Sequence, residues 1–210
     1  MAVTKAQMAE QVLRLIAGGD SSPDLKLDVR DVELLIDEAL GYVIKASFWE
    51  NRKSGESEIN SDFVTAFEDV EVRQDAKKNL RYSELPAKKI ILPNDMGVYQ
   101  VSRMEDQENT FKRMPNGALG IFKGLPAADL EGEIGYFVEG DRIYYNKNLD
   151  FNYQKKVLIK MVVSASSLDD DATLPIPGDM ELQLLELIVK FAREQKIAPQ
   201  DKVPDTSKQT

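Results

Sequence analysis

The densest group of side chains that could bind a metal ion is the run Asp169, Asp170 and Asp171. Carboxylate oxygens are the ligands that Mg²⁺ and Ca²⁺ prefer. However, consecutive residues point in different directions, and the run lacks the ligand spacing and the final Glu of an EF-hand loop. We therefore interpret it as a solvated loop and predict no metal site. A carboxylate- and metal-dependent hydrolase remains a remote alternative.

The composition limits the remaining site chemistry. The 210 residues include no His and no Cys. This excludes Ser-His-Asp and Cys-His nucleophiles, imidazole and thiolate metal centres, iron–sulfur clusters and disulfides. The spacing of the carboxylates, Lys, Tyr and hydroxyls that remain suggests no catalytic group. We predict a protein that is not an enzyme and that needs no cofactor.

Two features could suggest phosphate or nucleic-acid binding. The glycine-containing residues 117–124 match neither Gly-x-Gly-x-x-Gly nor Gly-Lys-Ser/Thr, so we interpret them as part of a loop that presents Phe111, Met114 and Phe122 to a neighbouring molecule. Tyr144 and Tyr145 lie on a predicted strand, where packing is a better interpretation than base stacking. With 27 basic and 36 acidic residues the net charge is −9, which does not favour attraction to nucleic acid.

Helices are predicted at both ends of the chain. Thr4 and Gln7 form a capping box before a helix that stops at Gly18 and Gly19, and Asp28 caps a longer helix that reaches about Trp49. A third helix runs from about residue 178 to 195. Its apolar arc is widened by Leu182 and Leu187, which indicates contacts on more than one side.

Short alternating runs predict a mostly antiparallel β region in the middle of the chain. The candidate strands are residues 67–73, 89–92, 98–103 and 156–163, together with a hairpin of residues 136–138 and 142–145 around Gly140. Residues 104–124 have no clear periodicity and are predicted to be irregular. The same holds for the polar stretch 51–58, which we interpret as a linker.

The order of elements predicts an α+β fold in which the terminal helices form a bundle and the β domain is inserted between them. We expect an N-terminal helical part at 1–60 and a β-rich domain at 61–168. The C-terminal helix at 169–197 should pack back on the N-terminal helices. Residues 198–210, which include Pro199, Val203 and Pro204, are predicted to be a flexible tail.

Both ends of the chain resemble a known group of proteins. Residues 14–20, 27–39 and 174–181, with the helix that follows the last, resemble virion structural proteins of crAss-like, short-tailed bacteriophages. More distantly, they are similar to the head-to-tail adaptor or tail-tube ring proteins of other short-tailed phages. The resemblance implies a homo-oligomeric ring, usually dodecameric, that joins the portal protein of the capsid to neighbouring tail or ring proteins.

Such a ring would be made in the host cytoplasm and reside in the virion, without a membrane partner. DNA would pass through its channel, and an acidic wall would discourage binding of phosphates. Another tail or capsid-associated virion protein is the alternative. The expected contacts between subunits or rings are Phe111, Met114, Phe122, Leu182, Leu187, Pro199 and Val203.

Overall fold

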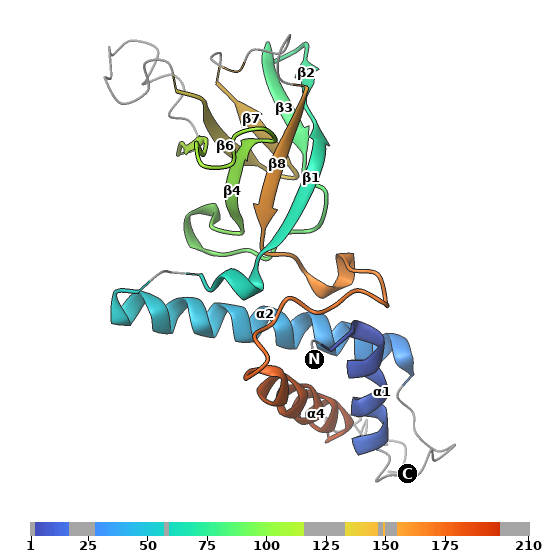
Figure 1. Ribbon diagram of the computed structural model, residues 1–210. Helices are drawn as coiled ribbons and strands as arrows, with labels where there is room; N and C mark the ends of the chain where they lie inside the picture. Colours follow the sequence, from blue (N-terminus) through green and yellow to red (C-terminus); the bar gives the residue numbers. More distant parts are fainter. Residues whose placement is uncertain are drawn as a thin grey trace, which may run out of the picture. The chain divides into compact units, whose positions relative to one another are not determined.

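The protein has an α+β fold, as predicted (Figure 1). The computed structural model describes residues 3–16, 28–56, 59–115, 133–146, 149 and 155–197. The chain divides into two compact units. Residues 1–43 and 169–210 form the first, here called the helical unit, and residues 44–168 form the second, the β unit. The β unit is thus inserted in the sequence between the two segments of the helical unit.

The predicted capping signals start the first two helices. Helix α1 (Lys5–Ile16) begins with a capping box, in which the Gln7 amide donates to Thr4 Oγ1 at 3.2 Å and the Thr4 amide to Gln7 Oε1 at 3.1 Å. Helix α2 (Val29–Ser54) begins after Asp28, whose Oδ1 accepts a hydrogen bond from the Asp31 amide at 2.9 Å.

Helix α2 is longer than the sequence pattern predicts. Its last turns are polar, but Glu, Arg and Lys are good helix formers, so the helix continues without an apolar repeat. Gly55, with φ of 74°, follows its end. The division between the two units falls after Val43, inside α2, whereas the sequence predicts a boundary at residue 60.

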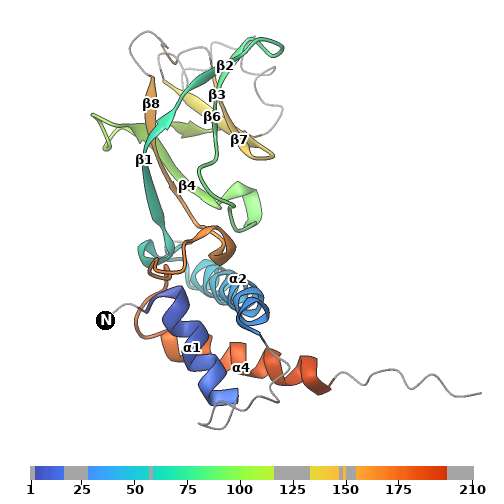
Figure 2. The ribbon, with the colours of Figure 1, turned by 90° about the vertical axis from the view of Figure 1, so that its right-hand side faces the viewer.

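The helical unit brings together segments from the start and from the end of the described chain. Helix α4 (Glu181–Ile197) packs against α1, and both views show the two helices side by side (Figures 1 and 2). The backbone before α1 also pairs with the segment before α4, since the Leu174 amide donates to Val3 O at 3.0 Å. The buried apolar residues of the two helices include Met8, Val12, Leu184, Ile188 and Ala192.

The described residues of the β unit include the second half of α2 and form two sheets. The three-stranded sheet has the order β1-β8-β4, and the five-stranded sheet the order β2-β3-β7-β6-β5. All strand pairs are antiparallel except β5 with β6. The strands are β1 (Thr65–Glu71), β2 (Arg73–Asp75), β3 (Leu80–Glu84), β4 (Val98–Arg103), β5 (Lys112–Arg113), β6 (Gly135–Glu139), β7 (Arg142–Tyr145) and β8 (Lys156–Met161).

The predicted hairpin is confirmed as β6 and β7, with Gly140 at φ of 60° in its turn. Three features of this region differ from the expectations. The sequence pattern does not predict β3, residues 89–92 make only an isolated bridge from Lys89 to Val163, and β5 interrupts the stretch predicted to be irregular.

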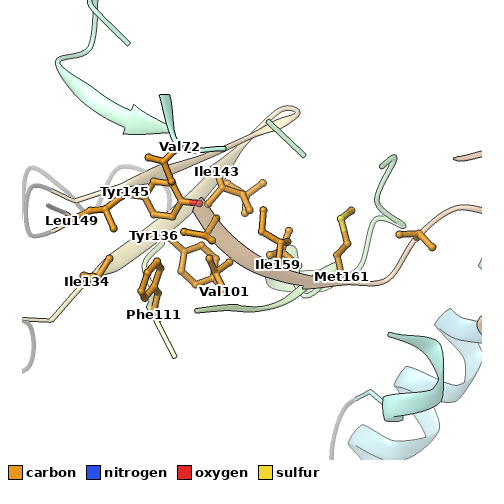
Figure 3. Packing of buried hydrophobic residues seen from close by; sticks show 14 residues of the cluster. Val72, Val101, Phe111, Ile134, Tyr136, Ile143, Tyr145, Leu149, Ile159 and Met161 are labelled. Carbon is orange, nitrogen blue, oxygen red and sulfur yellow. The ribbon is translucent and has the colours of Figure 1, made fainter. Parts of the chain in front are cut away.

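Side chains from both sheets form the core of the β unit (Figure 3). Val101 and Ile159 come from the three-stranded sheet, and Tyr136, Ile143 and Tyr145 from the five-stranded sheet. All are buried. The inner faces of the two sheets therefore cover each other.

Candidate functional site

An apolar groove lies along α1 and α4 in the helical unit. Its volume is about 560 Å³. Among the residues that the structure describes, the apolar side chains that line it are Leu15, Leu182, Leu185 and Val189, and the charged ones are Glu186, Lys190, Arg193 and Glu194. We call this set of residues the α1/α4 groove.

The groove exists because α4 has more apolar surface than its contact with α1 covers. One arc of α4, with Leu184, Ile188 and Ala192, is buried. Successive helix residues are rotated by about 100°, so the groove residues Leu182, Leu185 and Val189 form a neighbouring arc.

The predicted apolar surplus of this helix is present at Leu182, which is 64 % exposed. Leu187 is only partly exposed and does not line the groove. The role of either residue as a contact between subunits stays a prediction.

Helix α2 has an exposed face within the helical unit. Leu34 is 68 % exposed and Tyr42 60 %. Arg30 and Glu38 lie on the same side, because residues four apart in a helix are neighbours on its surface, and Asp31 is exposed beside them. We call these five exposed residues the α2 face. Up to the end of the helical unit, the buried residues of α2 are Val32, Leu35, Ile36, Ala39, Leu40 and Val43.

Two of the predicted contact residues are not at the surface. Phe111 is 6 % exposed and Met114 is also buried, so the prediction that a loop presents them to a neighbour is wrong. The Phe111 amide donates to Val101 O at 2.7 Å and the Met114 amide to Tyr136 O at 2.7 Å, which ties the segment to β4 and β6. The intervening strand β5 is too short to show an alternating pattern. Phe122, Pro199 and Val203 lie outside the described residues.

The aromatic residues of the five-stranded sheet are packed rather than open for base stacking. Tyr144 and Tyr145 are both buried, and Tyr144 stacks on Phe137 with ring centroids 5.4 Å apart. Lys78 Nζ lies 4.2 Å from the centroid of the Tyr144 ring. Lys78 is also paired with Glu139, and this hydrogen bond raises the pKa of Lys78. The packing interpretation of the two tyrosines is confirmed.

The Asp run has a structural contact at its middle residue. Lys5 Nζ donates to Asp170 Oδ1 at 2.9 Å and lies 4.0 Å from Glu33 Oε2, while the Ala6 amide donates to Asp170 O at 2.9 Å. Asp170 thereby ties its loop to the start of α1. Within the described ranges, no group of three or more acidic side chains is arranged to hold a metal ion.

Two comparisons with known proteins gave no match. No family model matches the chain, and a search of curated proteins found no similar sequence. In the part of the chain that the structure describes, no helix is long and apolar enough to cross a membrane. A functional proposal therefore depends on the surfaces of the chain itself and on the resemblance of its ends.

Proposed function

We propose that this chain is a virion structural protein, the subunit of a head-to-tail connector ring between the portal and the tail. The observation that carries the proposal is the uncovered apolar surface of the helical unit, at the α1/α4 groove and at the α2 face. A ring subunit contacts two neighbours through two different surfaces. The resemblance of residues 14–20, 27–39 and 174–181 to phage virion proteins supports the same assignment.

The net charge of −9 suits a subunit that surrounds DNA without binding it. An acidic channel wall repels phosphates over a range of about 8 Å at physiological salt. DNA then leaves the capsid without adhering to the ring. This part of the proposal depends on position: acidic side chains have to line the channel of the assembled ring rather than its outer rim.

The test is assembly of the purified full-length chain, alone and mixed with the portal protein of the same phage. Mass photometry gives the mass of the particles, and negative-stain microscopy gives their shape. We expect the chain to form rings of twelve subunits, and we expect these rings to bind the portal. A chain that remains monomeric and ignores the portal would contradict the connector role. Rings that bind only a tail or capsid protein would support the alternative virion role.

The contrasting enzyme class has a separate test. A hydrolase that used the Asp run would need a tight Mg²⁺ or Mn²⁺ site there. Calorimetric titration with each metal, on the wild type and on a variant with Asp169, Asp170 and Asp171 replaced by Asn, measures such a site directly. Tight binding that the replacement abolishes would favour the hydrolase over the connector.

A further inference from the structure

We infer that the α1/α4 groove of one copy receives the α2 face of a second copy of this chain. The inference rests on the proposed function, because it assigns the surfaces through which neighbouring ring subunits would meet. Both surfaces belong to the helical unit, and they are different parts of it. Each copy can therefore use its groove for one neighbour and its α2 face for the other, as a heterologous contact requires.

The groove residues of α4 have the spacing of a hole that receives one large side chain of a facing helix. Residues at positions i, i+3, i+4 and i+7 of a helix surround a hole into which a side chain of a facing helix packs. Leu182, Leu185, Glu186 and Val189 have this spacing, and all four line the groove. Leu34 is the most exposed apolar residue of the α2 face, so we place it in this hole.

Charges on the two surfaces are complementary when α2 of one copy runs parallel to α4 of the other. Glu38 lies about 6 Å beyond Leu34 along α2, at about 1.5 Å per residue. It then falls at the level of Val189 and Lys190, beside the cation Lys190 and about one turn before Arg193. Lys190 Nζ is 3.9 Å from Glu194 Oε1, but both side chains are exposed, and such a pair is weak enough to exchange partners.

Tyr42 extends the same alignment by one more turn. It lies about 12 Å beyond Leu34 along α2, which places it at the level of Arg193. A guanidinium group over a tyrosine ring is a favourable contact, and both side chains are exposed in the single copy. The alignment therefore gives a partner to each of the exposed residues Leu34, Glu38 and Tyr42.

The C-terminal tail is a poorer occupant of the groove than a second copy. Residues 198–210 contain Val203 as their one large aliphatic side chain and carry no aromatic residue. A segment of that composition has little apolar surface to bury against the apolar residues of the groove. The α2 face offers Leu34 and Tyr42 on a helix that is already formed, so little conformational entropy is lost on binding.

The experiment uses two full-length variants that each break one surface. Leu182→Glu breaks the groove and Leu34→Glu breaks the α2 face, and both positions are exposed enough to accept a charge. We expect each variant alone to self-associate at least about tenfold more weakly than the wild type in sedimentation velocity. An equimolar mixture should form dimers but no rings, because one intact groove meets one intact α2 face.

The matched control is Ile91→Glu, which changes an exposed apolar residue of the β unit and should assemble as the wild type does. Three results would overturn the inference and leave the ring proposal intact. Both variants could form rings as the wild type does, only one variant could lose its rings, or the mixture could form no dimers. A wild type that stays monomeric with and without the portal would overturn both.

A second pair of variants applies if a Glu substitution disturbs folding, as judged by circular dichroism and thermal melting. Glu38→Lys and Lys190→Glu change only exposed charges. Each should weaken assembly, and the two together in one chain should restore it, because the two positions then again carry opposite charges. Assembly that the double variant does not restore would contradict the parallel alignment.

Discussion

The two units of the chain differ in how they cover their large apolar side chains. In the β unit, Phe111, Tyr136 and Tyr145 are buried between two facing sheets (Figure 3). In the helical unit, Leu34 is 68 % and Leu182 64 % exposed. Two facing sheets can bury both inner faces in one layer of side chains, whereas a few helices leave apolar arcs uncovered. The β unit also exposes single apolar residues, among them Ile91 at 78 %, so the contrast is between its closed core and the uncovered apolar arcs of the helical unit.

The largest expected effect comes from opening the core of the β unit. Phe111→Ala removes a buried ring that meets Tyr145 edge to face at 5.9 Å, so the free energy of unfolding should fall by about 3 to 5 kcal/mol. Hydrogen exchange measured by mass spectrometry should become faster in β8 and stay unchanged in α4.

Ile91→Ala is the control, because Ile91 is 78 % exposed and its loss should cost at most about 0.5 kcal/mol. Equal costs for the two variants would mean that Phe111 behaves as a surface residue, as the sequence pattern predicts. Faster exchange in both units would mean that the helical unit depends on the core of the β unit.

A smaller effect is expected from the buried charge of the helical unit. Lys5→Met keeps the apolar stem but removes the ion pair with Asp170, and the free energy of unfolding should fall by about 1 to 2 kcal/mol. The cost is limited because the Asp170 side chain is 68 % exposed and can be solvated by water. Exchange should become faster at the start of α1 and remain unchanged in β8.

Asp170→Asn provides the matched variant, since it removes the same ion pair from the other side. Asp170→Asn should lower thermal stability at low salt at least as much as Lys5→Met, because it leaves the buried Lys5 ammonium group with a weaker partner. A cost of about 3 kcal/mol or more for Lys5→Met, which is the cost of leaving a buried charge unpaired, would contradict a solvated Asp170.

The smallest effect concerns alkaline pH and the β unit. Burial raises the pKa of Tyr145, whose hydroxyl donates to Ser83 Oγ at 3.0 Å, and burial also raises the pKa of Tyr136. A group with a raised pKa in the folded state stabilises the fold fully below its unfolded pKa, which is about 10 for Tyr. This stabilisation is lost as the pH rises from that value through the raised pKa of the folded state. The β unit should therefore lose stability above about pH 10.

Tyr145→Phe tests this assignment through melting temperatures measured from about pH 7 to pH 11, on either side of the unfolded pKa. At neutral pH the variant should lose about 1 kcal/mol, because the hydrogen bond to Ser83 is gone. Its further loss at high pH should be smaller than that of the wild type. An unchanged alkaline slope would show that Tyr145 does not cause the loss.

Features that depend on neighbouring residues were predictable from the sequence. The capping box of Thr4 and Gln7 and the hairpin turn at Gly140 involve groups a few residues apart, and the structure has both. The apolar surplus at Leu182 was predictable too, because helix periodicity alone places it outside the arc of Leu184 and Ile188.

Features that depend on distant partners were not predictable. Strand β3 places the polar residue Ser83 at a fully buried position, where its hydroxyl accepts the hydrogen bond from Tyr145. The alternation of polar and apolar residues in the sequence does not indicate this hydrogen bond. Conversely, residues 89–92 have the apolar pattern of a strand, but Ile91 is exposed and the segment forms no ladder.

By itself, the sequence determined the α+β class, the starts of the first two helices and an acidic chain without His or Cys. These depend on composition and on interactions within a turn or a hairpin. Only the tertiary structure decided which other apolar residues are covered: Phe111 and Met114 are buried, and Leu34 and Tyr42 are exposed. The physical reason is that coverage of a side chain depends on packing between segments far apart in the chain.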